Sequence, residues 1–322
     1  MSDAVLERIK GVLYGQAVGD ALGLGTEFMS KEEVGRYYQF GLTRYGQILQ
    51  DGHRRRWAKG AWTDDTEQLL CVVDSLLACG EVDVVDIAGR LHRWALTGKG
   101  IGQTVGAVLA HPKFLTEPHE AARAIWEASG RKSAANGGVM RTAALGLWDY
   151  SDPAKVRQNG EAVCRITHYD PRCVGSCVVV SLAIAAMLRG ERDVAVLWAE
   201  AERVGREYDE RIGEYLARAN HSLAALELDE GLDAEKGEWG KIGYTLKAMG
   251  AGFWALRYGE SYRQAISAIV MEGGDADTNA AVAGAMLGAR WGLTGVDSRW
   301  AAGLVGGERL ASVAEGLWTQ LK

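Results

Sequence analysis

The feature that most restricts the fold of this chain is the helical spacing of its apolar residues. Between residues 69 and 77 the leucines and valines recur three and four positions apart, which places them on one face of a helix. The same spacing, with arginine and glutamate in between, continues through 194–216. Four more segments have helix-like patterns: 119–129, 153–168, 241–258 and 261–271. Because no series of alternating strands accompanies them, the sequence predicts one all-α domain over residues 1–322.

Length and composition agree with a single compact bundle of many helices. At 322 residues the chain is long enough to bury a substantial core, and no long internal repeat or linker divides it. Its hydrophobic fraction of 48% and charged fraction of 24% are usual for a globular protein. We therefore expect an orthogonal multi-helix bundle and exclude an α/β fold or a repeat array.

The net charge argues against a nucleic-acid partner. The formal charge is −6, whereas binding to phosphates requires a basic face. The one basic run, Arg54, Arg55 and Arg56, is too short to change this and is interpreted as a solvated loop.

Cysteine usage and the N-terminal sequence indicate a cytoplasmic protein that does not enter a membrane. The cysteines show no zinc-ligand spacing and lie in apolar segments, so we expect reduced, buried thiols at Cys71, Cys79, Cys164, Cys173 and Cys177. The first residues lack the apolar stretch of a signal peptide. The most apolar run, 174–188, is shorter than the roughly 20 residues that span a bilayer, which predicts a helix buried on all sides.

Glycines recur every fourth residue in the first expected helix, which covers about 4–23: Gly11, Gly15, Gly19 and Gly23. Close packing against another helix explains such a stripe and is favoured for the first two glycines. For the last two, an alternative is that the backbone approaches a ligand. Asp20 lies between them as an acid in an apolar helix, so it needs a partner, and we place it among the ligand-binding candidates.

Two short acidic stretches stand at the expected starts of apolar helices. "WTDDTEQLL" (62–70) precedes a helix expected to begin near Glu67, and "GGDADT" (273–278) precedes the apolar run that follows it. Taken singly, each stretch is explained by capping, since Thr and Asp are preferred N-cap residues and acids favour the first turn. A cap needs only one oxygen, however, and each stretch offers two carboxylates beside a hydroxyl. Together they supply six candidate metal ligands: Thr63, Asp64, Asp65, Asp275, Asp277 and Thr278.

Two acidic helix N-termini that face each other would repel unless cations lay between them. Ligand sets made only of oxygen suit Mg²⁺ or Mn²⁺ rather than zinc. Two-metal sites typically hold their ions about 3.5–4 Å apart. Glu27, just beyond the first helix, could supply a further carboxylate. The sequence thus predicts a cleft at helix N-termini that holds two divalent cations.

Five motifs in this order resemble the ADP-ribosylglycohydrolase family, which includes dinitrogenase reductase-activating glycohydrolases and ADP-ribosylarginine hydrolases. They are "GQAVGDALGLGTEF", "WTDDTEQLL", "NGGVMRTAALGL", "THYDP" and "GGDADTNAAVAGAMLGARWG". The resemblance extends over nearly the whole chain. It implies an all-α fold whose two-metal cleft removes ADP-ribose from a protein side chain.

The resemblance also implies a role for each acidic residue. It divides the six ligands between two ions bridged by Asp277: Thr63, Asp64 and Asp65 on the first, Asp275 and Thr278 on the second. Glu27 would lie beside this cluster. The catalytic candidates are the carboxylates that could act as general base or stabilise an oxocarbenium-like state: Glu27, Asp64, Asp65 and Asp277.

The remaining motifs would hold the nucleotide. Asn136 and the flexible backbone at Gly137 and Gly138 suit a phosphate or ribose, although an ordinary loop before a helix has the same composition. His168 with Asp170 in "THYDP" could be no more than a hydrogen bond at a helix end. The family match instead implies that His168 contacts the ribose or adenine side of the ligand.

A second glycine-rich loop, "TGKGIGQT", could line the cleft through Gly100 and Gly102. Some relatives that act on ADP-ribosylarginine carry an acid where this chain has Gly100. This departure leaves the expected fold and metal site intact but weakens the case for arginine.

The resulting hypothesis is a metal-dependent hydrolase that cleaves ADP-ribose from a modified protein side chain, with arginine as the first candidate linkage. Free ADP-ribose would be the product. The alternatives are another two-metal hydrolase that acts on phosphoesters of the ADP-ribose type, and a non-catalytic relative that binds ADP-ribose.

Overall fold

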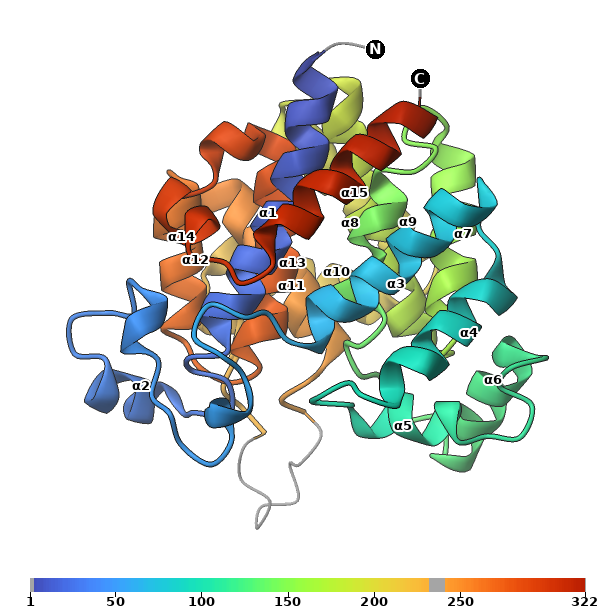
Figure 1. Ribbon diagram of the computed structural model, residues 1–322, viewed down its shortest axis with the longest axis horizontal. Coiled ribbons are helices and arrows are strands. Elements are labelled where there is room, and N and C mark those ends of the chain that lie inside the picture. The colour runs from blue at the N-terminus through green and yellow to red at the C-terminus, as the bar shows by residue number, and fades with distance from the viewer. Residues whose placement is uncertain (1–2, 232–240, 322) are drawn as a thin grey trace.

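The computed structural model describes residues 3–231 and 241–321, and the regular structure within these ranges is helical (Figure 1). The described residues contain no β-strand beyond one isolated antiparallel bridge between Ala135 and Tyr244. The prediction of an all-α fold is therefore confirmed.

In chain order the α-helices are α1 (Asp3–Gly23), α2 (Lys31–Tyr37), α3 (Asp64–Cys79), α4 (Val84–Ala95), α5 (Gln103–Leu109), α6 (Pro118–Ala128), α7 (Pro153–Cys164), α8 (Pro171–Arg189), α9 (Val194–Arg206), α10 (Glu210–His221), α11 (Thr245–Tyr258), α12 (Tyr262–Val270), α13 (Ala276–Trp291), α14 (Ser298–Ala302) and α15 (Gly307–Gln320). Short 3-10 helices lie between them: η1 (Tyr45–Gln47), η2 (Arg54–Arg56), η3 (Val139–Gly146), η4 (Ala224–Leu226) and η5 (Leu293–Gly295).

The helices α1 and α13 form the centre of the molecule and pack with their backbones in contact. A Cβ atom built on Gly15 would lie 2.2 Å from the carbonyl oxygen of Gly284, and one on Gly19 would lie 2.1 Å from that of Ala280. Gly11 and Gly23 meet α13 in the same way, at Gly288 and Ala276. Packing therefore accounts for the whole glycine stripe, including the two glycines for which a ligand was the alternative. Because residue numbers rise along α1 as they fall along α13, the helices are antiparallel, and the end of α1 lies beside the start of α13.

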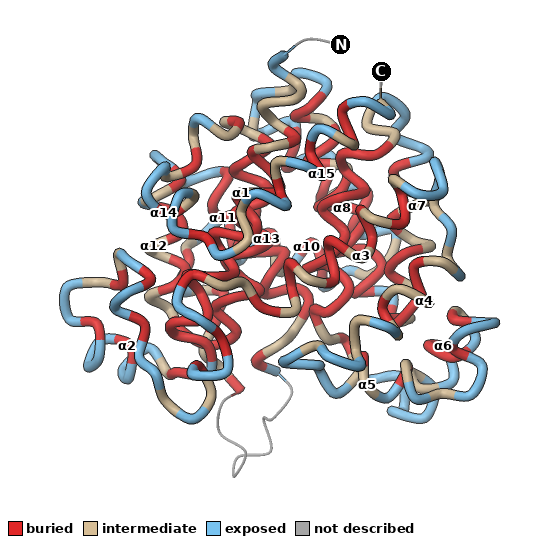
Figure 2. The backbone as a smooth tube through the Cα atoms, viewed as in Figure 1, coloured by how far each residue is buried: buried red, intermediate tan, exposed pale blue. Residues whose placement is uncertain are grey.

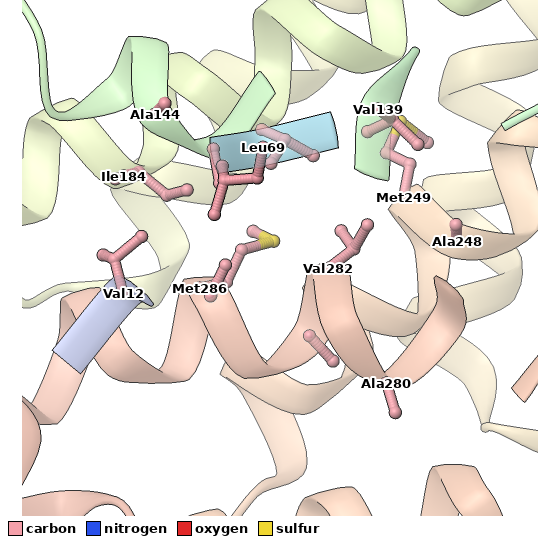
Figure 3. Packing of buried hydrophobic residues seen from close by; sticks show 14 of the residues in the cluster. Val12, Leu69, Val139, Ala144, Ile184, Ala248, Met249, Ala280, Val282 and Met286 are labelled. Carbon is pink, nitrogen blue, oxygen red and sulfur yellow. The ribbon is translucent and has the colours of Figure 1, made fainter. Parts of the chain in front are cut away.

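Buried residues from several helices surround this pair, as the burial colouring of the backbone shows (Figure 2). Met286 and Val282 extend from α13 toward Leu69 of α3, and Ile184 of α8 lies nearby (Figure 3). The helix α8 is the one described helix long and apolar enough to span a membrane by length and composition, but 78% of its apolar window is buried inside the protein. This agrees with the predicted buried helix over 174–188.

Three details differ from the sequence predictions. The segment 194–216 is two helices, α9 and α10, because the Asp209 side chain caps the backbone N–H of Arg211 and starts a new helix. The helix α3 begins at Asp64 rather than near Glu67. The five cysteines are free, as expected, but Cys79 is exposed and Cys71 only partly buried.

Candidate active site

A cavity of about 1210 Å³ opens where the N-termini of α3 and α13 meet the end of α1. Most of the predicted site residues line it: Glu27, Asp64, Asp65, Gly100, Gly102, Asn136, Gly137, His168, Asp275, Asp277 and Thr278. Three do not line it: Asp20, Thr63 and Gly138. The two acidic stretches, more than 200 residues apart, therefore converge on one space.

Asp20 holds the start of α3 from the neighbouring helix α1. Its carboxylate accepts hydrogen bonds from the backbone N–H groups of Thr63 (2.8 Å) and Thr66 (3.0 Å) and from the Thr66 hydroxyl (2.6 Å). These contacts satisfy amides that a helix N-terminus otherwise leaves without partners. Asp20 is fully buried and does not line the cavity, so it supports the site from behind the cavity wall, and its predicted contact with a ligand stays a prediction.

The carboxylates fall into two groups that share Asp277. Oxygens of Asp20, Asp65 and Asp277 lie within 4.8 Å of one another, and so do oxygens of Glu27, Asp275 and Asp277. The Thr63 hydroxyl lies 3.2 Å from Asp65 Oδ2 and 3.4 Å from Asp277 Oδ2. Asp65 Oδ1 is buried and has no hydrogen-bond partner among the described residues. Such an oxygen, in an oxygen-only set, suits a hard divalent cation.

Capping explains only part of this arrangement. Thr63 is the N-cap of α3, and its side chain accepts from the backbone N–H of Asp65 at 3.5 Å. Asp275 occupies the N-cap position of α13 but makes no capping hydrogen bond. Its carboxylate instead accepts from the Asn136 amide at 2.6 Å, which joins the "NGG" loop to the acidic cluster.

The glycines before Asp275 aim it at the cavity. Gly273 and Gly274 have φ angles of +75° and +71°, a left-handed conformation that side chains disfavour. The backbone N–H of Phe28 donates to the Gly274 carbonyl (2.7 Å), and that of Gly274 donates to the Met29 carbonyl (2.8 Å). This pairing holds the loop that carries Glu27 against the start of α13.

The Glu27 loop depends on two residues that the sequence analysis did not identify. The Arg54 guanidinium donates to the carbonyl oxygens of Leu24 and Gly25, each at 3.0 Å, and to that of Glu27. His53 Nε2 lies 2.5 Å from Glu27 Oε2. The interpretation of this basic run as solvated is wrong for Arg54, which is 3% exposed. The sequence signal for this contact is general: cationic side chains are stabilising near the C-terminus of a helix, and α1 ends just before Glu27.

Burial and mutual repulsion raise the pKa values of the clustered carboxyls. Desolvation is the main cause for Asp64, Asp65 and Asp277, whose pKa values lie well above the ordinary range, and the charges of neighbouring carboxylates add to it. For Asp275, desolvation and then the Glu27 charge raise the pKa to about 6. Ionised together, these groups would repel each other, and a bound cation would remove that cost. The acidic cluster could therefore hold metal ions.

One buried cation already lies at the edge of this cluster. Lys247 is 1% exposed, lines the cavity, and donates from Nζ to the carbonyl oxygens of Glu227 (2.5 Å) and Glu230 (2.9 Å). Its charge is among the causes that lower the pKa of Asp275, though burial outweighs it. Lys247 was not among the site residues predicted from the sequence.

The opposite wall of the cavity carries His168. A Cβ atom on Gly137 would lie 2.8 Å from His168 Cε1, so this glycine permits the close approach of loop and ring. Gly138 faces away from the cavity, where a Cβ would meet Cys164 Sγ at 3.0 Å. Burial and the charge of Arg141 lower the pKa of His168 to about 3, so the ring is neutral.

The expected pairing of His168 with Asp170 does not form. The Asp170 carboxylate instead accepts from the Trp126 indole (2.9 Å), from the Arg172 guanidinium and from the first turn of α8. The Asp170 side chain is thus a helix cap, and His168 Nε2, beside the cavity, has no hydrogen-bond partner in the part of the chain that the structure describes.

Gly100 lies against the acidic cluster. Its φ is +80°, and a Cβ atom there would lie 2.9 Å from Asp64 Oδ1 and 3.4 Å from the Trp57 ring. The side chain of an acid at this position would therefore lie in close contact with the Asp64 carboxylate. Gly102, at the start of α5, has open space around it.

Comparison with known proteins points to one family. The sequence model of the ADP-ribosylglycohydrolase family matches residues 1–322. An ADP-ribosyl-[dinitrogen reductase] glycohydrolase of Rhodospirillum rubrum is 28% identical over 92% of this chain and 90% of its own length. The ADP-ribosylarginine hydrolase Tri1 of Serratia proteamaculans is 23% identical over 97% of this chain and 79% of its own. A solved structure described as an ADP-ribosylglycohydrolase-related protein complex covers all of both chains, with a TM-score of 0.74 and 26% identity.

Proposed function

The chain belongs to the ADP-ribosylglycohydrolase family, and on that basis we propose that it is a hydrolase that removes ADP-ribose from a modified protein side chain with the help of two divalent cations. Mg²⁺ and Mn²⁺ are the proposed ions, because the donors are carboxylate and hydroxyl oxygens. The expected partner is an ADP-ribosylated protein, free ADP-ribose is the product, and the expected location is the cytoplasm.

The observation that carries this proposal is the place of Asp277 between two acidic groups. Its carboxylate belongs both to the group with Asp20 and Asp65 and to the group with Glu27 and Asp275. A carboxylate shared in this way suits a bridging ligand between two ions. The Asp65 oxygen without a partner supports the same assignment. Because Asp20 is occupied by the amides of α3, Thr63 and Asp64 are the proposed partners of Asp65 on the first ion.

Bound cations would hold the ribose hydroxyls next to the scissile bond and act as Lewis acids there. Asp64, Asp65 and Asp277 line the cavity. Their proposed role is to supply negative charge that stabilises the positive charge developing on the ribose. Glu27 is the proposed general base, because His53 holds its carboxylate at the cavity wall. Water adds its oxygen to the anomeric carbon and gives a proton to Glu27. The bond to the side chain breaks, its electron pair stays on the departing atom, and Glu27 passes the proton to that atom.

Arginine remains the proposed linkage, supported by the similarity to the ADP-ribosylarginine hydrolase Tri1 of Serratia proteamaculans. The bond cleaved would then join the ribose to a guanidinium nitrogen. A Cβ atom at Gly100 would lie 2.9 Å from Asp64 Oδ1. Because this chain lacks the acid that some relatives carry at this position, other linkages belong in the same assay.

The test uses purified protein with Mg²⁺ or Mn²⁺ and substrates that carry ADP-ribose on arginine, on serine or on a nucleic acid. The proposal requires release of intact ADP-ribose from at least one protein-linked substrate, detected by mass spectrometry, and its loss on chelation of the metal. Release of AMP or inorganic phosphate would instead support a phosphohydrolase. Binding of ADP-ribose without hydrolysis of any substrate would support a non-catalytic relative.

A further inference from the structure

A chain of buried hydrogen bonds connects the two walls of the cavity behind its surface. Arg141 of η3 stands at its centre and is fully buried, yet it does not line the cavity. Its NH1 group lies 3.1 Å from Gln68 Oε1, and its NH2 group lies 2.6 Å from Thr167 Oγ1. Gln68 is in turn hydrogen-bonded to Asp64, and Thr167 is hydrogen-bonded to His168.

Arg141 fixes the direction of the hydrogen bonds on the Gln68 branch. A guanidinium can only donate, so the atom of Gln68 that faces it is the amide oxygen. The amide nitrogen of Gln68 must then face the other way, where it donates to Asp64 Oδ2 at 3.1 Å. This leaves Asp64 Oδ1, the oxygen beside Gly100, directed at the cavity.

Arg141 also fixes the direction of the hydrogen bonds on the Thr167 branch. Thr167 Oγ1 accepts from Arg141, and among the described residues its one further polar contact is His168 Nδ1, at 2.8 Å. The hydroxyl proton therefore goes to Nδ1, which acts as acceptor. The opposite arrangement, with a proton on Nδ1, would leave the buried hydroxyl proton with no acceptor, which costs free energy.

A neutral imidazole with an unprotonated Nδ1 carries its proton on Nε2. His168 Nε2 is buried, lies beside Gly137 at the cavity wall, and has no hydrogen-bond partner among residues 3–231 and 241–321. Burial and the positive charge of Arg141 both oppose a second proton on the ring. The other neighbour, Cys164, donates from Sγ to the backbone oxygen of His168 and does not compete for the ring.

We propose that Arg141 and Thr167 are positioning residues that hold His168 as a fixed Nε2–H donor, and that this donor binds a lone pair of the ligand, such as a phosphate, ribose or adenine acceptor atom. The inference rests on the proposed function in taking ADP-ribose as the ligand. His168 then recognises its partner without any change of charge. The site distinguishes an acceptor from a donor at this position, because a ligand N–H would face another N–H.

The polarity of His168 can be read directly by ¹⁵N NMR of the imidazole rings. The chain has six histidines, and the His168 signals are those lost in His168→Gln. In the wild-type protein at pH 7 we expect a neutral ring with a bare Nδ1 and a protonated Nε2. A charged ring, or a proton on Nδ1, would overturn the proposal whatever the activity of the protein.

The second measurement is calorimetric binding of ADP-ribose to three variants. Thr167→Val keeps the shape of the side chain but removes the hydroxyl that connects Arg141 to His168 in the relay Arg141–Thr167–His168. We expect this variant to bind ADP-ribose about tenfold more weakly, the scale of one lost hydrogen bond. Thr167→Ser restores the hydroxyl and should bind like the wild type. The matched control is Thr142→Val, the same change at a buried threonine whose hydroxyl donates to the Val139 carbonyl and, within the described ranges, to no other group.

Equal affinity of Thr167→Val and Thr142→Val, or failure of Thr167→Ser to restore binding, would refute the relay. If the wild-type protein neither binds ADP-ribose nor releases it from any substrate, the proposed function fails instead, and the NMR result still decides the state of His168. Arg141→Met should shift the His168 proton from Nε2 toward Nδ1, as Thr167→Val should, provided that circular dichroism shows a folded protein. An unchanged tautomer in folded Arg141→Met would remove Arg141 from the relay.

Discussion

Replacement of Gly15 by alanine should show how strongly the pairing of α1 with α13 constrains the fold. The new Cβ would lie 2.2 Å from the Gly284 carbonyl oxygen and 2.9 Å from its carbon. A carbon and an oxygen that are not bonded need about 3.2 Å or more, by the contact distances of packed interiors. The two helices must therefore separate by roughly 1 Å, and because both contacting groups are backbone, no side chain can rotate to relieve the contact.

The size of the effect follows from two opposing contributions. Alanine stabilises a helix interior by about 1 kcal/mol relative to glycine. Overpacking of a rigid interface typically costs about 1–3 kcal/mol and occasionally more, and an immovable backbone neighbour belongs at or above the upper end of that range. We expect Gly15→Ala to lower the free energy of unfolding by about 2–3 kcal/mol on these figures.

The assay is urea unfolding followed by circular dichroism at matched protein concentration. Gly35→Ala is the matched control: this glycine is exposed in α2 with nothing within 4 Å of its Cβ position. The control should be as stable as the wild type or slightly more stable, since only the helix propensity changes. Equal stability of the two variants would refute the reasoning that backbone contact requires the glycine stripe.

Three further predictions concern the acidic cluster and its support. Because the pKa of Asp275 is raised to about 6 in the folded protein, the stability of the metal-free protein should fall as pH rises from about 4 to 6. Mg²⁺ or Mn²⁺ should raise the melting temperature mainly above that pH range. A melting temperature that neither ion changes at pH 7 would contradict this prediction. Asp277→Asn should abolish ADP-ribose release while the circular dichroism spectrum stays helical, and normal turnover would exclude a bridging role. Arg54→Leu should lower the free energy of unfolding by about 3–5 kcal/mol, because carbonyl oxygens at the end of α1 lose a buried charged donor. The control, Arg55→Leu at an exposed position, should change the free energy of unfolding by no more than about 0.5 kcal/mol. Similar losses in both variants would argue against the buried role of Arg54.

The helices could be predicted from sequence wherever local spacing decides them. The segment 261–271 and the buried run 174–188 appear close to their expected bounds as α12 and α8. The break between α9 and α10 was missed because apolar spacing continues on both sides of it, while the cap at Asp209 decides the boundary. The start of α3 was placed too late because its cap comes partly from Asp20, in another helix.

The acidic residues of the site could be predicted because they cluster within two short stretches with unusual composition. Their convergence is a long-range effect of the antiparallel pairing of α1 with α13, which the glycine stripe indicated without naming the partner helix. His53 and Arg54 were missed because their contacts lie more than 20 residues away along the chain. Thr167 was missed because its importance comes from Arg141, which is distant in sequence.

The pairing of the first long helix with α13 has a consequence for synthesis on the ribosome. The carboxylates of Asp20 and Asp277 belong to one group, although the ribosome makes one near the beginning of translation and the other after more than 250 further residues. Until α13 emerges, α1 exposes its glycine stripe and its buried acid to solvent or to chaperones. Contacts of such separation form late. The nascent chain is therefore expected to acquire metal only near the end of translation, after most of its helices are already made.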